Sequence, residues 1–410
     1  MQNTHPSLRN RETIAKALRL YAISNCDCDL EDVRKAFQAG VTFFQLREKH
    51  LSHDAFLAKA KAIRSFCPED VPLIINDDID IAIESDADGV HIGPKDGSVA
   101  EARKRLGPDK ILGVSARSVA QALAAEKDGA DYLGVGAVFP TSTKADAKPL
   151  ARKTLRAICA SVKIPVVAIG GITADNLKEL GGTGIKGVAV VSAVFGTPDV
   201  TDAVGKLSDA TRGMLSVEVK KPQGAIVDLD GVVLDSLGVW KKIDHQYLVD
   251  LGLADRPEVV ERLKNASTLM DAAQYLYHEC HVAKTPQTIC SEFHAILASF
   301  YRDSLLLVPG AREALERFKR LGIQTALVTA SPEDLVMAAL RRNKADDYFD
   351  HFFFNSEKTD PSVFLHVVEV LGTGIPQTIV YDDLDRIRAT AESLGFSTHP
   401  ALPLPDPSSR

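Results

Sequence analysis

Long apolar runs are missing from this 410-residue sequence, and none approaches the roughly 18 to 20 consecutive apolar residues that a membrane helix needs. The first residues, MQNTHPSLRNRET, are polar and have no apolar stretch of the kind found in a secretory signal. We therefore expect a cytoplasmic protein without a membrane partner. The composition, 45% hydrophobic and 25% charged, is typical of globular proteins, and the length suits two domains.

Cysteine is scarce and shows no functional spacing. The six cysteines include no CxxC pair and no zinc-ligand pattern, which argues against a zinc site and against a disulfide framework. A formal net charge of −7 argues against a nucleic-acid-binding surface. The expected partners are therefore small molecules, and an anionic one would need a local pocket of Lys, Arg and metal.

Short apolar runs alternate with amphipathic segments in the first half of the chain. They are LRLYAIS, TFFQLR, VPLIIND, GVHIG, ILGVSA, DYLGVG, PVVAIGGI and GVAVVSAV. These runs show little polar alternation, as expected for parallel strands that are covered on both faces. The pattern predicts an α/β protein whose residues 1–213 form a (β/α)8 TIM barrel.

A second domain is expected over residues 224–410, after a short charged linker at 214–223 that contains Pro222. It opens with the apolar run AIVDLDG and resumes strand and helix alternation at IQTALVTAS, YFDHFFF and QTIVYDD. Between these runs, at about 237–305, the pattern is helical. This organisation predicts a Rossmann-like open α/β domain with a helical insertion after its first strand.

Polar side chains follow the predicted strands of the barrel, where the functional residues of this fold lie. The string QLREKH places Gln45, Arg47 and Lys49 on one side of a strand end. Asp77 and Asp96 lie at or after the ends of neighbouring strands, where two carboxylates suit Mg²⁺, although each could instead be a helix cap. The loop FPTSTKADA adds hydroxyls and an ammonium, and the paired glycines of AIGGI can approach a phosphate through their backbone amides.

Together, and in this order, these strings resemble the thiamine phosphate synthase family. The resemblance implies that hydroxymethylpyrimidine diphosphate is joined to a thiazole phosphate with release of pyrophosphate, and that Mg²⁺ is required. Asp77 and Asp96 would hold the metal, and Ser115 would lie against the pyrimidine. The residues that contact the diphosphate and stabilise its departing charge would be Gln45, Arg47, Lys49, Asn76 and Lys144. The thiazole phosphate contacts would be Thr141, Thr143, Gly170, Gly171, Val191 and Ser192.

The match to this family has two departures. Pro94 stands where the family usually has Gln, and the stretch KPLARKTL has no Gly soon after the TxTK loop. A related thiazole tautomerase shares the barrel and is an alternative, but it does not need the complete charged set. The synthase is favoured by the joint presence of the complete charged and polar set: Arg47, Lys49, Asn76, Asp77, Asp96 and Lys144.

The string AIVDLDGVVLDS carries the chemistry of the second domain. Asp228 and Asp230 end an apolar strand two residues apart, and Gly231 permits a sharp turn after them. One carboxylate can attack phosphorus while the other transfers a proton. The hhhDxDGxxxDS frame resembles the first motif of haloacid dehalogenase-like phosphatases, and Thr329, Lys358 and the pair Asp382 and Asp383 follow in that family's order.

The second resemblance implies a role for each of these residues. Asp228 would be the nucleophile and Asp230 the general acid and base, while Thr329 and Lys358 would neutralise the transferred phosphoryl group. A second Mg²⁺ would be held by Asp228, the Asp230 carbonyl, Asp382 and Asp383, with the relative share of the last two left open. The helical insertion would be a cap over the substrate. Its polar residues are expected on the surface or in packing: Trp240, Lys241, His245 and Lys264.

The sequence therefore predicts a bifunctional enzyme of thiamine biosynthesis that acts on small phosphorylated substrates. We hypothesise that the second domain removes phosphate from thiamine phosphate or from a phosphorylated precursor. The alternatives are a synthase with a non-catalytic or unrelated second domain, a phosphoryl mutase of the same class, and a regulator that binds thiamine intermediates. A homodimer is left open.

Overall fold

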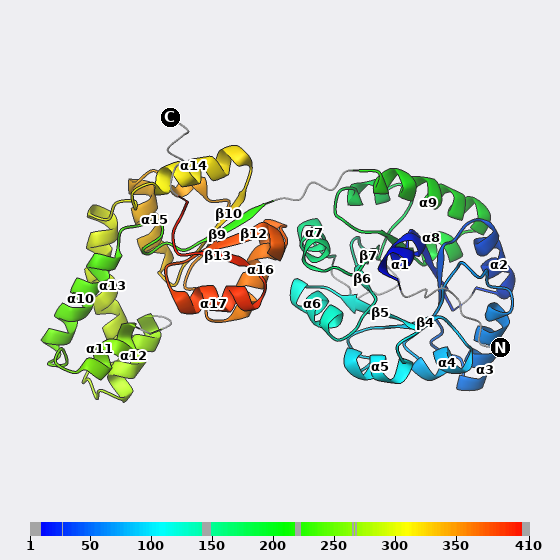
Figure 1. Ribbon diagram of the computed structural model, residues 1–410, viewed down its shortest axis with the longest axis horizontal. Helices are drawn as coiled ribbons and strands as arrows, with labels where there is room; N and C mark the ends of the chain where they lie inside the picture. Colours follow the sequence, from blue (N-terminus) through cyan, green and yellow to red (C-terminus); the bar gives the residue numbers. More distant parts are fainter. Residues whose placement is uncertain are drawn as a thin grey trace. The chain divides into compact units, whose positions relative to one another are not determined.

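A computed structural model of the chain describes residues 10–26, 28–141, 149–217, 223–264, 266 and 269–403. The chain forms two compact units, Met1–Lys221 and Pro222–Arg410, coloured from blue to green and from green to red in Figure 1. No helix in these ranges is both long enough and apolar enough to cross a membrane. Each unit is described by itself below.

The first unit is a closed barrel of eight parallel strands, which confirms the predicted TIM barrel (Figure 1). The strands are β1 (Leu20–Ile23), β2 (Phe43–Leu46), β3 (Leu73–Asn76), β4 (Gly89–Ile92), β5 (Ile111–Ala116), β6 (Tyr132–Gly136), β7 (Val166–Ile169) and β8 (Gly187–Val190). Each of the eight apolar runs of the sequence contains one strand. Most of these strand residues are buried, because the barrel interior covers one face and helices cover the other.

Most helices of the barrel begin at an Asp or Ser side chain that caps them, and α7 and α8 are the exceptions among those named here. They are α2 (Leu30–Gln38), α3 (His53–Arg64), α4 (Ile79–Glu84), α5 (Val99–Leu106), α6 (Val119–Lys127), α7 (Arg152–Ser161), α8 (Ser192–Phe195) and α9 (Val200–Leu215). Asp29, Ser52 and Ser98, for example, accept a hydrogen bond from a backbone N–H in the first turn of the helix that follows. Asp78 caps α4 in this way, which leaves the neighbouring Asp77 for another role.

Three features of the barrel differ from the sequence prediction. A helix, α1 (Arg11–Ala17), precedes the first strand, and its Ile14 packs against the interior residues of the barrel. A single 3-10 turn, η1 (Leu177–Leu180), replaces a helix between β7 and β8. Helix α9 continues to Leu215, into the segment expected to be a linker, because Met214 is still buried on its inner face.

The second unit is an open, five-stranded parallel sheet with the order β11-β10-β9-β12-β13, which confirms the predicted Rossmann-like domain. Its strands are β9 (Gly224–Val227), β10 (Gln324–Val328), β11 (His351–Phe353), β12 (Thr378–Tyr381) and β13 (Ser397–His399). The helices after the cap are α14 (Ala311–Leu321), α15 (Glu333–Arg342), α16 (Pro361–Leu371) and α17 (Asp385–Ser393), with 3-10 turns η2 (Asp346–Tyr348) and η3 (Ile375–Gln377). The strand that opens the domain, β9, therefore lies at the centre of the sheet. The edge strand β13 was not predicted.

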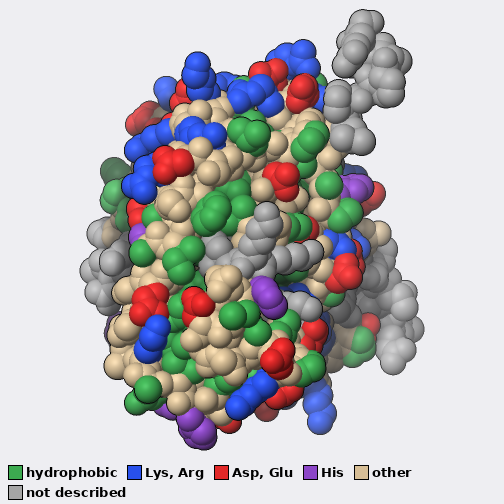
Figure 2. All heavy atoms as spheres, turned by 90° about the vertical axis from the view of Figure 1, so that its left-hand side faces the viewer, with side chains coloured by type: hydrophobic (Ala, Val, Ile, Leu, Met, Phe, Trp, Pro, Cys, Tyr) green, Lys and Arg blue, Asp and Glu red, His purple; other side chains and the backbone are tan. Residues whose placement is uncertain are grey.

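The predicted helical cap lies between β9 and α14. Its helices are α10 (Leu237–Asp250), α11 (Pro257–Lys264), α12 (Leu269–His278) and α13 (Pro286–Asp303), which form a separate helical lobe of the second unit in Figure 1. Val249 and Tyr277 are among the exposed apolar side chains on these helices. Figure 2 shows hydrophobic side chains interspersed with charged ones on this side of the protein.

Candidate active sites

The barrel brings the predicted site residues to one end. Gln45 lies in β2, Asn76 ends β3 and Ser115 lies in β5, while Gly170 and Gly171 follow β7 directly. Because all eight strands are parallel, their carboxyl ends meet at the same mouth of the barrel. Thr143 and Lys144 lie outside the described residues.

Asp77 adopts an unusual backbone conformation at the end of β3. Its φ of 65° lies in the left-handed region, which few residues other than glycine adopt and which Asp tolerates better than most. The Asp77 N–H donates to the His91 carbonyl on β4 at 2.9 Å. Its carboxylate forms an ion pair with Lys49 and accepts a hydrogen bond from the Asn76 side-chain amide at 2.7 Å. Three of the predicted charged and polar residues thus meet at this point.

Asp96 lies on the loop after β4, beside Asp77. Its carboxylate accepts a hydrogen bond from the Gly93 N–H at 2.8 Å. Partial burial raises the pKa of Asp96, and the neighbouring Asp77 carboxylate raises that pKa further, against the lowering effects of the Gly93 hydrogen bond and Lys49. The structure therefore brings the two predicted metal ligands together.

The residues near this carboxylate pair fit a divalent cation. Two acidic side chains face each other with Lys49 as their adjacent ammonium, so a cation that accepts hard oxygen ligands would relieve their repulsion. Pro94 is exposed between Gly93 and Asp96, and the Asp96 hydrogen bond to Gly93 is present with proline at that position.

The paired glycines after β7 have a steric role that sequence reasoning missed. Gly170 and Gly171 have φ values of 100° and 63°. A Cβ atom on Gly170 would come within 2.5 Å of the Ala137 Cβ, and one on Gly171 would collide with the Pro140 carbonyl oxygen. These glycines therefore let the loops after β6 and β7 approach each other, next to Thr141. The other predicted phosphate contacts, Val191 and Ser192, lie where β8 passes into α8.

Three barrel residues that sequence reasoning did not single out connect two that it did. Hydrogen bonds run from Gln45 through Tyr21, Tyr132 and His91 to Ser115. The two tyrosines look like ordinary core residues in the sequence, since each lies in an apolar strand. One sign of this network is present in the sequence: a polar ring lies within each of three apolar strands, at Tyr21, His91 and Tyr132.

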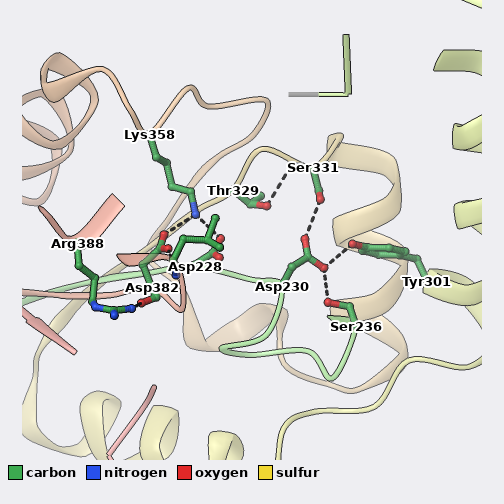
Figure 3. A network of polar contacts seen from close by, with 10 residues as sticks. Asp228, Asp230, Ser236, Tyr301, Thr329, Ser331, Lys358, Asp382 and Arg388 are labelled. Carbon is green, nitrogen blue, oxygen red and sulfur yellow. Dashed lines mark hydrogen bonds and ion pairs between the residues drawn. The ribbon is translucent and has the colours of Figure 1, made fainter. Parts of the chain in front are cut away.

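Adjacent strands of the second unit gather the other set of predicted residues. Asp228 follows β9, Thr329 follows β10 and Asp382 follows β12, and β9 pairs with both of the other strands. Lys358 comes from the loop between β11 and α16. Figure 3 shows the Lys358 ammonium between the carboxylates of Asp228 and Asp382.

Lys358 forms two short ion pairs in a buried environment. Its Nζ lies 2.7 Å from Oδ1 of Asp228 and 2.6 Å from Oδ2 of Asp382, and all three side chains are less than 10% exposed. Burial lowers the pKa of Lys358, but the two carboxylates outweigh this effect and raise the pKa above its usual value. Lys358 is therefore held as an ammonium.

Three carboxylates of this site could hold a metal ion. One oxygen from each of Asp228, Asp382 and Asp383 lies within 4.8 Å of the other two. Burial raises the pKa of Asp228 to about 7, with Lys358 lowering it and Asp382 raising it, and burial followed by Asp382 also raises the pKa of Asp383. Since Lys358 alone does not offset this buried negative charge, the donor set fits a divalent cation with oxygen ligands.

Asp230 points to a different set of donors, separate from Lys358 (Figure 3). One of its carboxylate oxygens accepts hydrogen bonds from Ser236 Oγ at 2.6 Å and from the Tyr301 hydroxyl. The other accepts from Ser331 Oγ at 2.8 Å. Ser331 and Tyr301 were missed because they lie about 100 and 71 positions away in the chain, where no local spacing links them to Asp230.

The turn after Asp230 depends on glycine. Gly231 has a φ of 83°, and a Cβ there would lie 3.0 Å from a carboxylate oxygen of Asp383. Thr329 is buried, and its hydroxyl oxygen accepts a hydrogen bond from the Ser331 N–H at 3.1 Å. Of the polar cap residues, His245 is exposed on α10, as expected, whereas the side chains of Trp240, Lys241 and Lys264 lie outside those described.

Comparison with known proteins assigns a family to each unit. The thiamine monophosphate synthase family model matches residues 20–194, and the haloacid dehalogenase-like hydrolase model matches residues 222–386. The chain is 49% identical over 197 residues to thiamine-phosphate synthase 2 of Streptococcus pneumoniae serotype 4, covering 47% of this chain and 92% of that protein. It is 44% identical over 204 residues to the thiamine-phosphate synthase of Pyrococcus furiosus, covering 49% of this chain and 95% of that protein.

A solved structure also resembles the barrel. Thiamine phosphate pyrophosphorylase from Pyrococcus furiosus aligns with a TM-score of 0.47 and 41% identity, over 50% of this chain and 100% of that one. The sequence matches cover nearly the full length of the synthases, and the hydrolase match begins where the second compact unit begins. The chain therefore belongs to the thiamine monophosphate synthase family through residues 20–194, and it carries a haloacid dehalogenase-like hydrolase domain at residues 222–386.

Proposed function

We propose that the protein is a bifunctional enzyme of thiamine biosynthesis. Its barrel condenses hydroxymethylpyrimidine diphosphate with thiazole phosphate to give thiamine phosphate and pyrophosphate. Its second domain is a Mg²⁺-dependent phosphatase for a small phosphate ester. The observation that carries the synthase half is the meeting of Lys49, Asn76, Asp77 and Asp96 at the mouth of a barrel that is 49% identical to a named synthase.

In the barrel, the residues of this chain act by holding charge and orientation. Asp77 and Asp96 would bind Mg²⁺, which supplies electrostatic stabilisation of the diphosphate leaving group. Gln45, Arg47, Lys49, Asn76 and Lys144 would contact the diphosphate and stabilise the charge that develops as the carbon–oxygen bond breaks. The thiazole nitrogen then forms the new bond to the pyrimidine methylene carbon. No protein group has to take a proton in this scheme.

A product analysis tests the synthase activity. We expect purified protein with both precursors and Mg²⁺ to form thiamine phosphate and pyrophosphate in equal amounts, measured by chromatography and a coupled pyrophosphate assay. Removing Mg²⁺ with EDTA should abolish formation, and excess Mg²⁺ should restore it, since the Asp77 and Asp96 carboxylates would otherwise face the diphosphate without a cation. Conversion of the thiazole phosphate alone, without any condensation product, would instead favour the tautomerase alternative.

In the second domain, the proposed chemistry divides between Asp228 and Asp230. An oxygen of Asp228 attacks phosphorus, and the bond from phosphorus to the ester oxygen breaks as that oxygen takes a proton from Asp230. Water then gives a proton to Asp230 and attacks the aspartyl-phosphate, which releases phosphate and restores Asp228. Lys358 and Thr329 hold the phosphoryl oxygens, and Asp382 and Asp383 with Asp228 would hold Mg²⁺, which neutralises charge on the phosphoryl group.

The arrangement of the two acids supports this division of roles. Asp228 is paired with the Lys358 ammonium, which suits a carboxylate that must be ionised to attack. Asp230 is instead held in position by the hydroxyls of Ser236, Tyr301 and Ser331, away from the Lys358 ammonium that pairs with Asp228. We propose thiamine phosphate or a phosphorylated precursor as the substrate, because the partner domain in the same chain makes or uses these compounds.

A further inference from the structure

The barrel interior contains a continuous chain of hydrogen bonds between two proposed substrate contacts. The Gln45 amide N–H donates to the Tyr21 hydroxyl oxygen. The Tyr21 and Tyr132 hydroxyl oxygens lie 2.9 Å apart, and the Tyr132 hydroxyl lies 3.0 Å from Nδ1 of His91. Nε2 of His91 lies 3.0 Å from Oγ of Ser115. Five residues from five strands, β1, β2, β4, β5 and β6, are therefore linked in series.

The residues of this hydrogen-bond series differ in how deeply they are buried. Tyr21 and Tyr132 are at most 1% exposed, whereas His91 and Ser115 are half-buried. Burial raises the pKa of both phenols above the usual value, so each keeps its single proton at neutral pH. A buried phenol with one proton can donate only one hydrogen bond, so the order of donors along the chain is restricted.

Two orders of donors satisfy these contacts. In one, Tyr21 donates to Tyr132, Tyr132 donates to Nδ1 of His91, and the Nε2–H of His91 donates to Ser115. In the other, Ser115 donates to Nε2, the Nδ1–H donates to Tyr132, and Tyr132 donates to Tyr21. In both orders a neutral His91 uses both ring nitrogens, so the Ser115 oxygen is held in one place.

The residues packed around the hydrogen-bond series restrict the rings of Tyr21, Tyr132 and His91. Gly113 on β5 is the strand partner of both His91 on β4 and Tyr132 on β6. A Cβ on Gly113 would collide with the Tyr132 ring and come within 2.5 Å of Nδ1 of His91, and one on Gly134 would come within 3.0 Å of the His91 ring. Phe43 packs edge-on against both tyrosine rings, with centroids 4.6 and 5.4 Å away. The rings therefore have little freedom to turn.

We propose that Tyr21, Tyr132 and His91 are positioning residues that hold the Ser115 hydroxyl in place for its contact with the pyrimidine ring. This inference rests on the proposed synthase function and adds to it the residues that position the pyrimidine contact. The three residues need not touch the substrate, because they act through Ser115.

A double-mutant cycle between Tyr132→Phe and Ser115→Ala tests the proposal. Phenylalanine keeps the ring packing and removes only the hydroxyl that orients His91. We expect Tyr132→Phe to lower kcat/KM for the pyrimidine diphosphate by about 10- to 100-fold, with the KM for thiazole phosphate changed less than about twofold. In the Ser115→Ala background the same change should lower kcat/KM by less than about threefold further, because its effect passes through Ser115.

A matched control and a second variant make the outcome decisive. Ser85→Ala also removes a buried hydroxyl from the barrel unit. This hydroxyl donates to the Ile81 carbonyl at 2.6 Å and takes no part in the hydrogen-bond series, so the change should leave both kinetic constants unchanged. Tyr21→Phe interrupts the chain one step earlier and should behave like Tyr132→Phe. Thermal melting of each variant shows whether the barrel remains folded.

Several results would overturn the inference. They are a Tyr132→Phe enzyme within about twofold of wild type, losses that simply multiply in the double mutant, an equal rise in the thiazole phosphate KM, or loss of the fold in both tyrosine variants. A wild-type protein that makes no thiamine phosphate would refute the proposed function instead, so the two failures can be told apart.

Discussion

Replacing Asp228 with Asn is expected to abolish phosphate release by the second domain while leaving thiamine phosphate synthesis intact. The amide keeps the size of the side chain but cannot attack phosphorus as a carboxylate does, and it removes one of the two negative partners of Lys358. We expect kcat for phosphate release from 4-nitrophenyl phosphate and thiamine phosphate to fall by roughly four orders of magnitude. Phosphate release and synthase turnover would be measured on the same preparations.

The matched control for this prediction is Asp255→Asn, the same change at an exposed position in the cap of the same unit. It should leave both activities unchanged. If wild type and Asp228→Asn release equal phosphate from an ester, the assigned nucleophile is wrong. If wild type hydrolyses 4-nitrophenyl phosphate but not thiamine phosphate, the domain is a phosphatase for a different ester.

Asp77→Asn is expected to reduce synthase turnover by on the order of a hundred- to a thousandfold. Asn tolerates the left-handed backbone at this position at least as well as Asp, so the fold should survive the change. The substitution removes one of two adjacent carboxylates and the ion pair with Lys49. We therefore also expect the Mg²⁺ concentration that gives half-maximal rate to rise, measured by titration of the pyrophosphate-coupled assay.

Asp86 supplies a closely matched control, because it shares three properties with Asp77. It is a non-glycine residue with positive φ, 54°, it belongs to the barrel, and it pairs with a lysine, Lys110, at 3.4 Å. Asp86→Asn should change neither the rate nor the Mg²⁺ dependence. A Mg²⁺ titration of Asp77→Asn that overlays the wild-type curve would contradict the metal-binding role of Asp77.

The parts of the fold that the sequence predicted correctly are those that depend on local pattern. Each apolar run became one strand, because strands buried on both faces need uninterrupted apolar residues. The residues after those strands came together because parallel strands share one carboxyl end, so Asp228 and Asp382 meet although 154 positions separate them. The roles given to these residues stay predictions until the variants are measured.

The parts that were missed depend on three-dimensional contacts. Tyr301 lies at the end of a cap helix, and nothing in its neighbourhood indicates that its hydroxyl reaches Asp230. Tyr21 and Tyr132 read as apolar core residues, and only the closed barrel brings their hydroxyls together. Helix α1 was missed because its seven residues, RETIAKA, are mostly polar and bury a single side chain, Ile14.

The row formed by His91, Gly113 and Tyr132 has a consequence for how the barrel assembles. These residues lie side by side on three neighbouring strands, and the residue on the middle strand is the glycine. Sliding the central strand by one residue would put Leu112 or Val114 between an imidazole and a phenol and would turn its side chains to the opposite face. Gly113 therefore helps to specify the strand register, because only the correct alignment of the strands leaves room for the two rings.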